Sequence, residues 1–536
     1  MNTRNRPGRM GSPLSNAQRP PYGLGTPAGS LQARVALSTP GRPRAPAGVV
    51  DRQPAVMNPA CTTEAGRPCR HPLTNVAENE RLLAHELKVK GRLDALVPVL
   101  KRIASHQHDA DFIERAQSMA REQLGFELPA GILEDAWVDS LDMRALYGES
   151  VIRSLYLLAE QARGAITQQG EDEAVSFFLD CGYHAVDITP CSDGRLKGLV
   201  RYILRLPNAA IRSRKAYAGA MFDVDANVKH WVETELMRYR EGRPVTADVG
   251  TRYLKMAVYH FSSSDPSHEG CAAHGSDERV AAESALRRLK EFRQAIENSF
   301  CCGASIDILL IGVDTDTDAI KVHVPDAEGE ISLYRVVDNL ELYRQTVSYN
   351  ANEARLKVYQ AIQAATANTG WGAGQGEPHE GMRRLIATVL INNLSQIEYV
   401  CGNWGGRYAD IGHAERFISV GDGFEEFQLR NLAYFAHLQT VEEGAPDMDV
   451  GIKIFTRLNV GHGLPIPIAI HFRYDSRVPG SRERIVERCQ RIKRAIESRY
   501  ATLVQKGLIL CGMTVQSTQP GSPIERLVHN GDVASH

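Results

Sequence analysis

The segment His184-Ala-Val-Asp-Ile-Thr-Pro-Cys-Ser-Asp-Gly-Arg195 leads from a short apolar run into a polar corner. Residues Ala185 to Ile188 predict a strand, and the amphipathic run from Leu196 to Leu206 predicts a helix after the corner. Unpaired N–H groups at a helix start and a nearby arginine favour the thiolate form of a cysteine, which binds metals or acts as a nucleophile. Cys191 is therefore placed for chemistry.

Asp193 and Arg195 follow this cysteine by two and four positions, close enough to pair with each other. An aspartate that is held by an arginine stays ionised and keeps a lone pair directed at a neighbouring site. The alternative interpretation is a buried structural cysteine beside a surface ion pair. These residues alone do not decide between the two.

The chain has 536 residues, with 62 Lys and Arg against 64 Asp and Glu. This length is too great for a single hydrophobic core, so about three domains are expected. The near-zero net charge argues against a general nucleic-acid binder, and no apolar run approaches the ~18 residues that predict a membrane span. The ten cysteines are scattered, as is typical of a reducing compartment where thiols are free to bind metal.

Residues 1–75 are rich in Arg, Pro and Gly and contain few large apolar residues, so we expect a disordered arm. A cationic arm of this kind is either a solubilising linker or a docking arm that orders on an acidic protein surface, and composition does not choose between them. Cys61, Cys69 and His71 lie near its end, but no fourth ligand is evident and no metal site is expected there.

A helical domain is predicted from residue 76 to about 165. Apolar residues recur there at helical spacing, for example Leu83 and Leu87 and later Leu155 and Leu158. The segment contains no evident cluster of catalytic residue types.

Strand signals become strong beyond residue 177. Short apolar or β-branched runs predict four strands, at Phe177–Leu179, Ala185–Ile188, Tyr253–Phe261 and Ile306–Val313. The last two flank a helix whose expected apolar stripe comprises Val280, Leu286, Leu289, Phe292 and Ile296. Strands that alternate with helices predict an α/β sheet with parallel strands, and ligands of such sheets collect at the carboxyl ends of the strands.

Two further candidate ligands fall at this predicted edge. His260 lies near the end of one strand, and Cys271 lies just before a helix that Ser276 can cap. With Cys191 they offer two thiolates and one imidazole, a three-ligand zinc site whose fourth position is left for water. His268 competes with His260, because His-x-x-Cys is a common ligand spacing. We expect His260 because a strand holds it, and His268 remains the alternative.

The second half of the chain resembles the first. The segment 184–194 can be laid without gaps over 413–423, which places Val420 at the position of Cys191. Phe424 then stands where Arg195 stands, and further along the chain His471 falls over His260. No cysteine corresponds to Cys271. We therefore predict an internal duplication whose second copy has lost the metal, with chance similarity of two α/β segments as the alternative.

The combination of Cys-x-Asp-x-Arg after a strand with His260 and Cys271 resembles the β-class carbonic anhydrases. It is most similar to their divergent carboxysomal shell branch, the carboxysomal shell carbonic anhydrases of α-type carboxysomes, over essentially the whole chain. Two departures from the usual β-class pattern stand out. Gly194 replaces the Ser of Cys-x-Asp-Ser-Arg, and a long loop separates His260 from Cys271 where the usual motif is His-x-x-Cys.

The resemblance implies an α/β fold with an N-terminal helical domain and two related β-carbonic-anhydrase-like domains, preceded by the arm. The expected segments are the disordered arm 1–75, the helical domain 76–165, the catalytic zinc-bearing domain 166–395, the degenerate repeat without zinc 396–516 and the tail 517–536. Two similar units of this kind are expected to pack about a pseudo-twofold axis.

The resemblance also implies zinc-dependent, reversible hydration of CO2 to bicarbonate, which inside the carboxysome supplies CO2 to Rubisco. One Zn2+ per chain is expected on Cys191, His260 and Cys271, with Asp193 and Arg195 as the catalytic dyad. An apolar wall for CO2 is expected from Phe177, Phe178, Val258 or a partner chain, and His274 is either a proton shuttle or a surface histidine. A shell- or Rubisco-organising scaffold with a structural zinc, or a zinc hydrolase, is the alternative.

The implied location is the inner side of the carboxysome shell, in the bacterial cytoplasm. The expected partners are the shell and, through the arm, Rubisco. A homodimer or higher homo-oligomer is expected, with no nucleic-acid or membrane partner.

Overall fold

The structure is a computed structural model that describes residues 70–136, 140–162, 176–207, 211–214, 216–240, 251–299, 304–367, 374–409, 415–424, 427–436, 441–519 and 521–527. Most of the expected arm, including Cys61 and Cys69, lies outside the described residues. Among the described helices, none is both long and apolar enough to cross a membrane.

The described chain begins with a helical region, as predicted. It comprises α1 (Val76–Asp94), α2 (Leu96–Ala104), α3 (Phe112–Gln123), α4 (Ala130–Asp135) and α5 (Met143–Ala162). Asn75 caps α1 by accepting a hydrogen bond from the N–H of Glu78. Residues just before this cap belong to the folded body, since His71 is buried.

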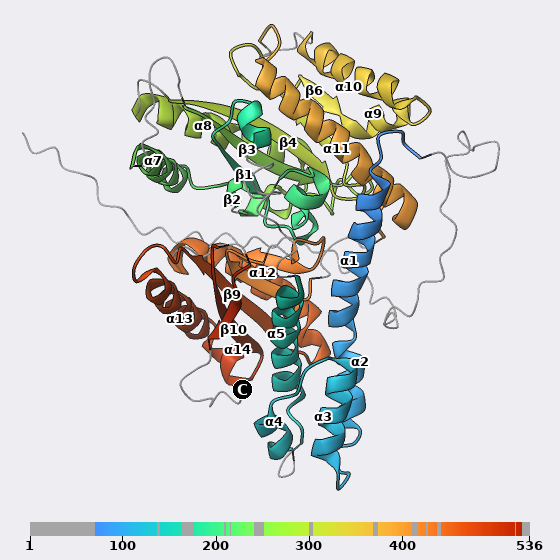
Figure 1. Ribbon diagram of the computed structural model, residues 1–536, viewed down its shortest axis with the longest axis vertical. Helices are drawn as coiled ribbons and strands as arrows, with labels where there is room; N and C mark the ends of the chain where they lie inside the picture. Colours follow the sequence, from blue (N-terminus) through green and yellow to red (C-terminus); the bar gives the residue numbers. More distant parts are fainter. Residues whose placement is uncertain are drawn as a thin grey trace, which may run out of the picture. The chain divides into compact units, whose positions relative to one another are not determined.

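A six-stranded sheet follows, with the strand order β2-β1-β3-β4-β5-β6 (Figure 1). Its strands are β1 (Ala185–Pro190), β2 (Ile211–Arg214), β3 (Thr251–Phe261), β4 (Ala304–Asp314), β5 (Ile320–His323) and β6 (Val336–Asp338). Strands β1 to β4 are parallel, but β5 and β6 pair antiparallel, so the expectation of a parallel sheet is wrong at this edge. The connection from β4 to β5 is too short for the crossover that a parallel pair needs.

Helices pack against this sheet. They are α7 (Val224–Arg240), α8 (Glu278–Ser299), α9 (Asn339–Thr346), α10 (Ala351–Thr366) and α11 (Glu380–Trp404). Helix α8 lies on β3 and β4 (Figure 1). Helix α11 lies against β5. The stripe of α8 is as predicted for Leu289, Phe292 and Ile296, but Val280 is 43% exposed and Ala281 is buried in its place.

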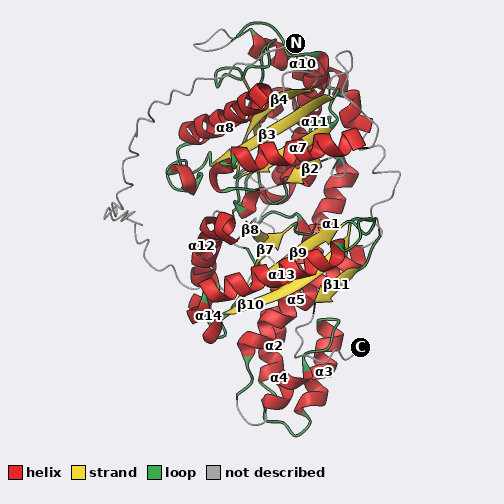
Figure 2. Ribbon diagram, turned by 90° about the vertical axis from the view of Figure 1, so that its left-hand side faces the viewer, coloured by secondary structure: helices red, strands yellow, loops and turns green. Residues whose placement is uncertain are grey.

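A second sheet has the order β11-β10-β9-β7-β8. Its strands are β7 (Phe417–Gly421), β8 (Ala433–Ala436), β9 (Ile466–Tyr474), β10 (Ile509–Ser517) and β11 (Ile524–Leu527), with helices α12 (Val441–Leu458), α13 (Ser481–Arg499) and α14 (Ala501–Gln505). Helix α5 packs on this sheet (Figure 2). A Cβ on Gly148 of α5 would lie 2.2 Å from Cδ1 of Leu510, so glycine permits this close approach.

Three local predictions need correction. Phe177 to Leu179 form part of a helical turn rather than a strand, because the N–H of Cys181 bonds back to the carbonyl of Phe177. The run after the corner forms a 3₁₀ turn at Gly194–Leu196 and a π-helical turn at Leu199–Ile203, not one regular helix. Asp277, not Ser276, caps α8, since its Oδ1 accepts the N–H of Val280 at 3.0 Å.

Candidate metal centre

Three of the predicted side chains meet at the carboxyl end of the first sheet. Cys191 directly follows β1, His260 is the penultimate residue of the neighbouring strand β3, and Cys271 lies in the loop that leads to α8. All three are buried, and their ligand atoms lie within 4.8 Å of one another. The N–H of Cys191 donates to the carbonyl of Val258, which fixes the cysteine against β3.

The donor set fits a metal ion. The two sulfur atoms are 3.9 Å apart, which is too far for a disulfide bond of about 2.05 Å. Nδ1 of His260 is buried and has no hydrogen-bond partner among the described residues. Two soft sulfurs and one imidazole nitrogen that converge in a buried space are the donors that transition metals prefer.

The thiols are electrostatically coupled. The hydrogen bond with Cys271 and burial both raise the pKa of the Cys191 thiol, whereas the hydrogen bond to Cys191 lowers the pKa of Cys271. The backbone N–H of Gly219 donates to Sγ of Cys191 at 3.3 Å. Such an N–H stabilises negative charge on the sulfur and orients it toward the metal position.

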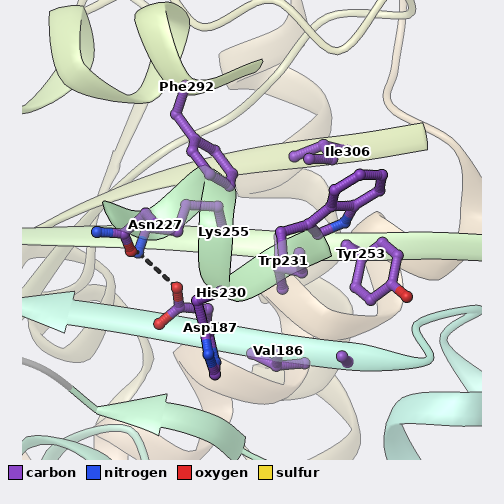
Figure 3. Close-up of a pocket in the computed structure, with 11 residues that line it drawn as sticks. Val186, Asp187, Asn227, His230, Trp231, Tyr253, Lys255, Phe292 and Ile306 are labelled. Carbon is purple, nitrogen blue, oxygen red and sulfur yellow. Dashed lines mark hydrogen bonds and ion pairs between the residues drawn. The ribbon is translucent and has the colours of Figure 1, made fainter. Parts of the chain in front are cut away.

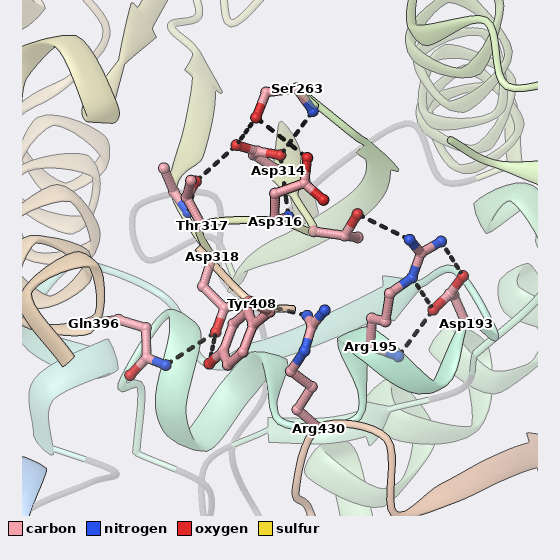
Figure 4. Close-up of polar contacts among 12 residues, drawn as sticks. Asp193, Arg195, Ser263, Asp314, Asp316, Thr317, Asp318, Gln396, Tyr408 and Arg430 are labelled. Carbon is pink, nitrogen blue, oxygen red and sulfur yellow. Dashed lines mark hydrogen bonds and ion pairs between the residues drawn. The ribbon is translucent and has the colours of Figure 1, made fainter. Parts of the chain in front are cut away.

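Asp193 and Arg195 form the expected pair beside this cluster (Figure 4). Oδ1 of Asp193 accepts the backbone N–H and Nε–H of Arg195 at 2.8 and 2.9 Å, and Oδ2 accepts Nη2–H at 2.8 Å. Burial opposes ionisation, but the guanidinium holds the pKa of Asp193 well below its usual range. The ionised Oδ2 lies 3.6 Å from Nε2 of His260, so a fixed negative charge faces the candidate metal position.

Sequence reasoning missed a third member of this arrangement. Nη1 of Arg195 donates to Oγ1 of Thr315 at 3.1 Å, and that hydroxyl donates to the carbonyl of Phe261. Thr315 is fully buried and follows β4 directly. It stands at the carboxyl end of a third parallel strand, and that position was a usable signal. Glu269, whose carboxylate lies 3.9 Å from Arg195, was missed as well.

The segment after β4 continues into a buried polar network (Figure 4). Asp318 accepts hydrogen bonds from Gln396 at 3.0 Å and from Tyr408 at 2.9 Å, and Arg430 of the second half lies 3.5 Å away. This network ties the loop that carries Thr315 to the rest of the molecule.

Several predicted residues lie outside the cluster. The side chain of His268 is 74% exposed and bonds to Asp265. The ring of His274 hydrogen-bonds to the carbonyl of Gly219. Phe177 and Phe178 precede β1 and lie toward the amino end of that strand, whereas Cys191 follows its carboxyl end.

The corresponding part of the second sheet has a different chemistry. His471 is buried, and its Nδ1 lies 2.9 Å from Oγ1 of Thr514. The ring of Phe424 stacks on the imidazole with centroids 4.2 Å apart. With Val420 in place of a thiol, the described residues of this sheet present no group of metal-binding donors.

A second buried charge in the first half has a structural explanation (Figure 3). Nζ of Lys255 donates to Asp187 at 2.6 Å, Thr189 at 2.8 Å and Asn227 at 2.7 Å, beside a cavity of about 30 Å³. An ammonium group has three donors, and all three are used. The ring of Phe222 lies 4.3 Å from the charge and adds a cation–π contact.

Family models of known proteins match nearly all of the described residues. Models of the carboxysome shell carbonic anhydrase match the N-terminal domain at residues 71–163, the catalytic domain at 173–413 and the C-terminal domain at 414–530. The catalytic match contains all three candidate ligands and the Asp–Arg pair.

Curated relatives agree. The chain is 52% identical to the carboxysome shell carbonic anhydrase of Halothiobacillus neapolitanus, over 98% of this chain and 99% of the relative. It is 49% identical to that of Prochlorococcus marinus (strain MIT 9313), over 84% and 87% of the two chains, and 44% identical to that of Hydrogenovibrio crunogenus, over 87% and 88%. These matches confirm the resemblance read from the motifs. The chain belongs to the carboxysome shell carbonic anhydrase family and is a carbonic anhydrase of the carboxysome.

Proposed function

We propose that Cys191, His260 and Cys271 hold one Zn2+ per chain and that the site catalyses reversible hydration of CO2 to bicarbonate. The carrying observation is the convergence of these donors beside an ionised Asp193. Two sulfurs that each lie about 2.3 Å from a tetrahedral zinc are about 3.8 Å apart. The separation of 3.9 Å between the two thiols matches this value.

Zinc, when bound, lowers the pKa of a coordinated water toward ~7 and so supplies a nucleophile at neutral pH. Asp193 accepts a hydrogen bond from the reacting water, and this bond turns the oxygen lone pair toward the carbon of CO2. Because the carboxylate stays ionised, it remains an acceptor throughout the range in which the enzyme works.

Arg195 holds this carboxylate in place. Its backbone N–H, Nε and Nη2 all bond to Asp193, so the carboxylate cannot rotate freely toward the open metal position. A bidentate arginine also fixes the plane of the carboxylate, which sets the direction of the acceptor lone pair. Arg195 is therefore a positioning residue for Asp193 in this mechanism.

The two alternatives are less favoured. A structural zinc usually has four protein ligands, whereas the described residues supply three and place an ionised carboxylate 3.6 Å from Nε2 of His260. A zinc hydrolase would share the open site, but family membership favours CO2 and bicarbonate as the substrates.

We also propose that the two sheets arose by duplication. In the first sheet, the neighbouring strands β2, β1, β3 and β4 are parallel and β5 is antiparallel to β4. In the second sheet, β8, β7, β9 and β10 are parallel in the same way and β11 is antiparallel to β10. The strand register supports the sequence alignment independently. Along the paired strands β1 and β3, Cys191 lies one position before the level of His260, and along β7 and β9, Val420 lies one position before the level of His471.

We propose domains close to the expected 76–165, 166–395 and 396–516, between an arm at 1–75 and a tail at 517–536. Three bounds shift: α11 continues to Trp404, β11 belongs to the second sheet rather than to the tail, and buried His71 belongs to the folded body rather than to the arm.

In the carboxysome the enzyme would dehydrate bicarbonate and so supply CO2 to Rubisco. We place it at the shell, as a homo-oligomer, with its arginine-rich arm docked on Rubisco. The support for the arm is its charge, with eight arginines and one early acid, Asp51, over residues 1–52. Binding of the full chain to Rubisco should weaken with added salt, and a chain that starts at Ala77 should not bind. Equal binding by both chains would contradict the docking role.

The ligand assignment is tested by metal analysis of two histidine variants. His260→Ala should lose zinc and activity, because it removes the buried donor. His268→Ala should keep both, because its side chain is exposed and paired with Asp265. Full zinc in the first variant and none in the second would reverse the assignment.

A further inference from the structure

The turn that carries the Asp–Arg pair contacts the half of the molecule that lacks the metal donors. The backbone N–H of Asn431 donates to the carbonyl of Gly194 at 2.9 Å. Asn431 is fully buried and has a φ of 53°, in the left-handed region that asparagine adopts more readily than most non-glycine residues. The second half therefore presents a fixed donor to the peptide between Asp193 and Arg195.

This donor is itself held in place. Nη1 of Arg416 donates to the carbonyl of Asn431 at 3.0 Å, and the backbone N–H of Arg416 donates to the carbonyl of Leu432 at 2.9 Å. The guanidinium of Arg416 also bonds to Asp94 at the end of α1. Arg416 thus connects the turn at Asn431 to the helical region through hydrogen bonds.

Glu415 occupies the space that a side chain at position 194 would need. A Cβ on Gly194 would lie 2.3 Å from Oε1 of Glu415 and 2.8 Å from its Cγ. Gly194 has no left-handed φ, so its backbone conformation does not require glycine. Glu415 is 5% exposed, so its side chain has little room to withdraw. The contact with Glu415 explains why this position lacks a side chain.

We propose that the half without metal donors positions the catalytic dyad. Glu415 packs against Gly194, and the N–H of Asn431 donates a hydrogen bond to the carbonyl of Gly194. The inference rests on the proposed roles of Asp193 and Arg195. The backbone N–H of Arg195 belongs to the peptide that follows Gly194 and donates directly to Asp193. A shift of that peptide therefore moves both the acceptor and the guanidinium that orients it.

A pair of compensating substitutions tests the packing of Glu415 against Gly194. Gly194→Ala should lower kcat by about 10- to 100-fold, because a methyl group against Glu415 displaces the dyad by a fraction of an ångström or more. Zinc content and KM should stay near wild type, and the melting temperature should fall by only a few degrees, because overpacking a buried contact destabilises the fold. The double variant Gly194→Ala/Glu415→Ala should regain most of kcat, because the shortened side chain makes room for the methyl group.

The matched control is Gly402→Ala, which adds the same methyl group to an exposed face of α11 with no atom within 4 Å. It should behave as wild type. Wild-type kcat in Gly194→Ala, or a double variant no better than the single one, would overturn the proposal. Parallel loss of zinc would do so too, because the role would then be structural.

Two further measurements keep the test decisive. If Gly194→Ala does not fold, Glu415→Ala alone tests the proposal. Its kcat should fall several-fold with zinc retained, and an unchanged kcat would overturn the positioning role of Glu415. Asp193→Asn serves as a reference. Full activity in that variant would instead refute the dyad assignment of the proposed function, so the two failures are distinguishable.

Discussion

Oγ1 of Thr315 accepts a hydrogen bond from Nη1 of Arg195 at 3.1 Å and donates one to the carbonyl of Phe261 at 3.0 Å. One hydroxyl therefore connects the guanidinium of the dyad to the residue that follows the ligand candidate His260. The dyad is held from two sides, by Thr315 within the catalytic half and by the Gly194 contacts with the other half.

Thr315→Val removes this hydroxyl and preserves the shape of the side chain. A hydrogen bond to a charged group contributes roughly 1.5–3 kcal/mol, so we expect kcat to fall about tenfold when Arg195 loses this acceptor. Zinc content should not change. Thr315→Ser keeps the hydroxyl and should recover most of the activity in stopped-flow CO2 hydration. Full activity in the valine variant would show that the contact is incidental.

Asp193→Asn should retain zinc and lose turnover by about 100-fold or more, because the amide presents a donor where the mechanism needs an ionised acceptor. Zinc analysis and CO2 hydration on the same preparation measure both properties. Asp225→Asn, which changes an exposed aspartate at the start of α7, is the control and should be silent. Since the pKa of Asp193 is held well below its usual range, protonation of this residue should add no acid limb to the pH profile above pH 5.

Folding stability should fall between pH 6.5 and pH 4. Burial lowers the pKa of His71 from 6.5 to about 4, where its ring stacks on Tyr343 and lies 2.9 Å from Thr346. The unfolded chain binds the proton first, so stability that is complete above pH 6.5 is lost toward pH 4, by on the order of 3 kcal/mol for this group. His71→Phe should flatten the dependence of melting temperature on pH, whereas His268→Ala should not. An unchanged slope in the phenylalanine variant would contradict this origin.

Lys255→Met should destabilise the first half without affecting the metal centre. The substitution leaves the carboxylate of Asp187 without its partner, which costs about 3 kcal/mol. Chemical denaturation should report the loss, and zinc content should stay at the wild-type level. Zinc loss at native temperature would instead indicate that Lys255 supports the metal site.

The candidate metal centre could be predicted from the sequence because parallel strands place the side chains at their carboxyl ends along one edge of the sheet. Cys191 follows a strand, His260 lies near the end of the next one and Cys271 lies in the loop before a helix, so the predicted alternation of strands and helices placed them at one edge. Thr315 obeys the same rule, but a threonine carries no chemical signature that separates it from structural threonines.

Other features depended on contacts that no local pattern encodes. Phe177 and Phe178 have strong strand propensity, yet tertiary packing places them in a helical turn. The antiparallel edge at β5 is an exception, because the short connection that forces it lies within the local sequence. The packing of Glu415 against Gly194 joins residues more than 200 positions apart, and only the folded chain brings them together.

The most direct test of the central claim is the zinc content of the purified full chain, measured with its CO2 hydration rate before and after removal of metal by a chelator. We predict one zinc per chain, loss of hydration on removal and recovery when zinc is returned, with neither binding nor recovery in Cys191→Ala or Cys271→Ala. Hydration that persists without metal, or full zinc in either cysteine variant, would contradict a metal centre on these three side chains.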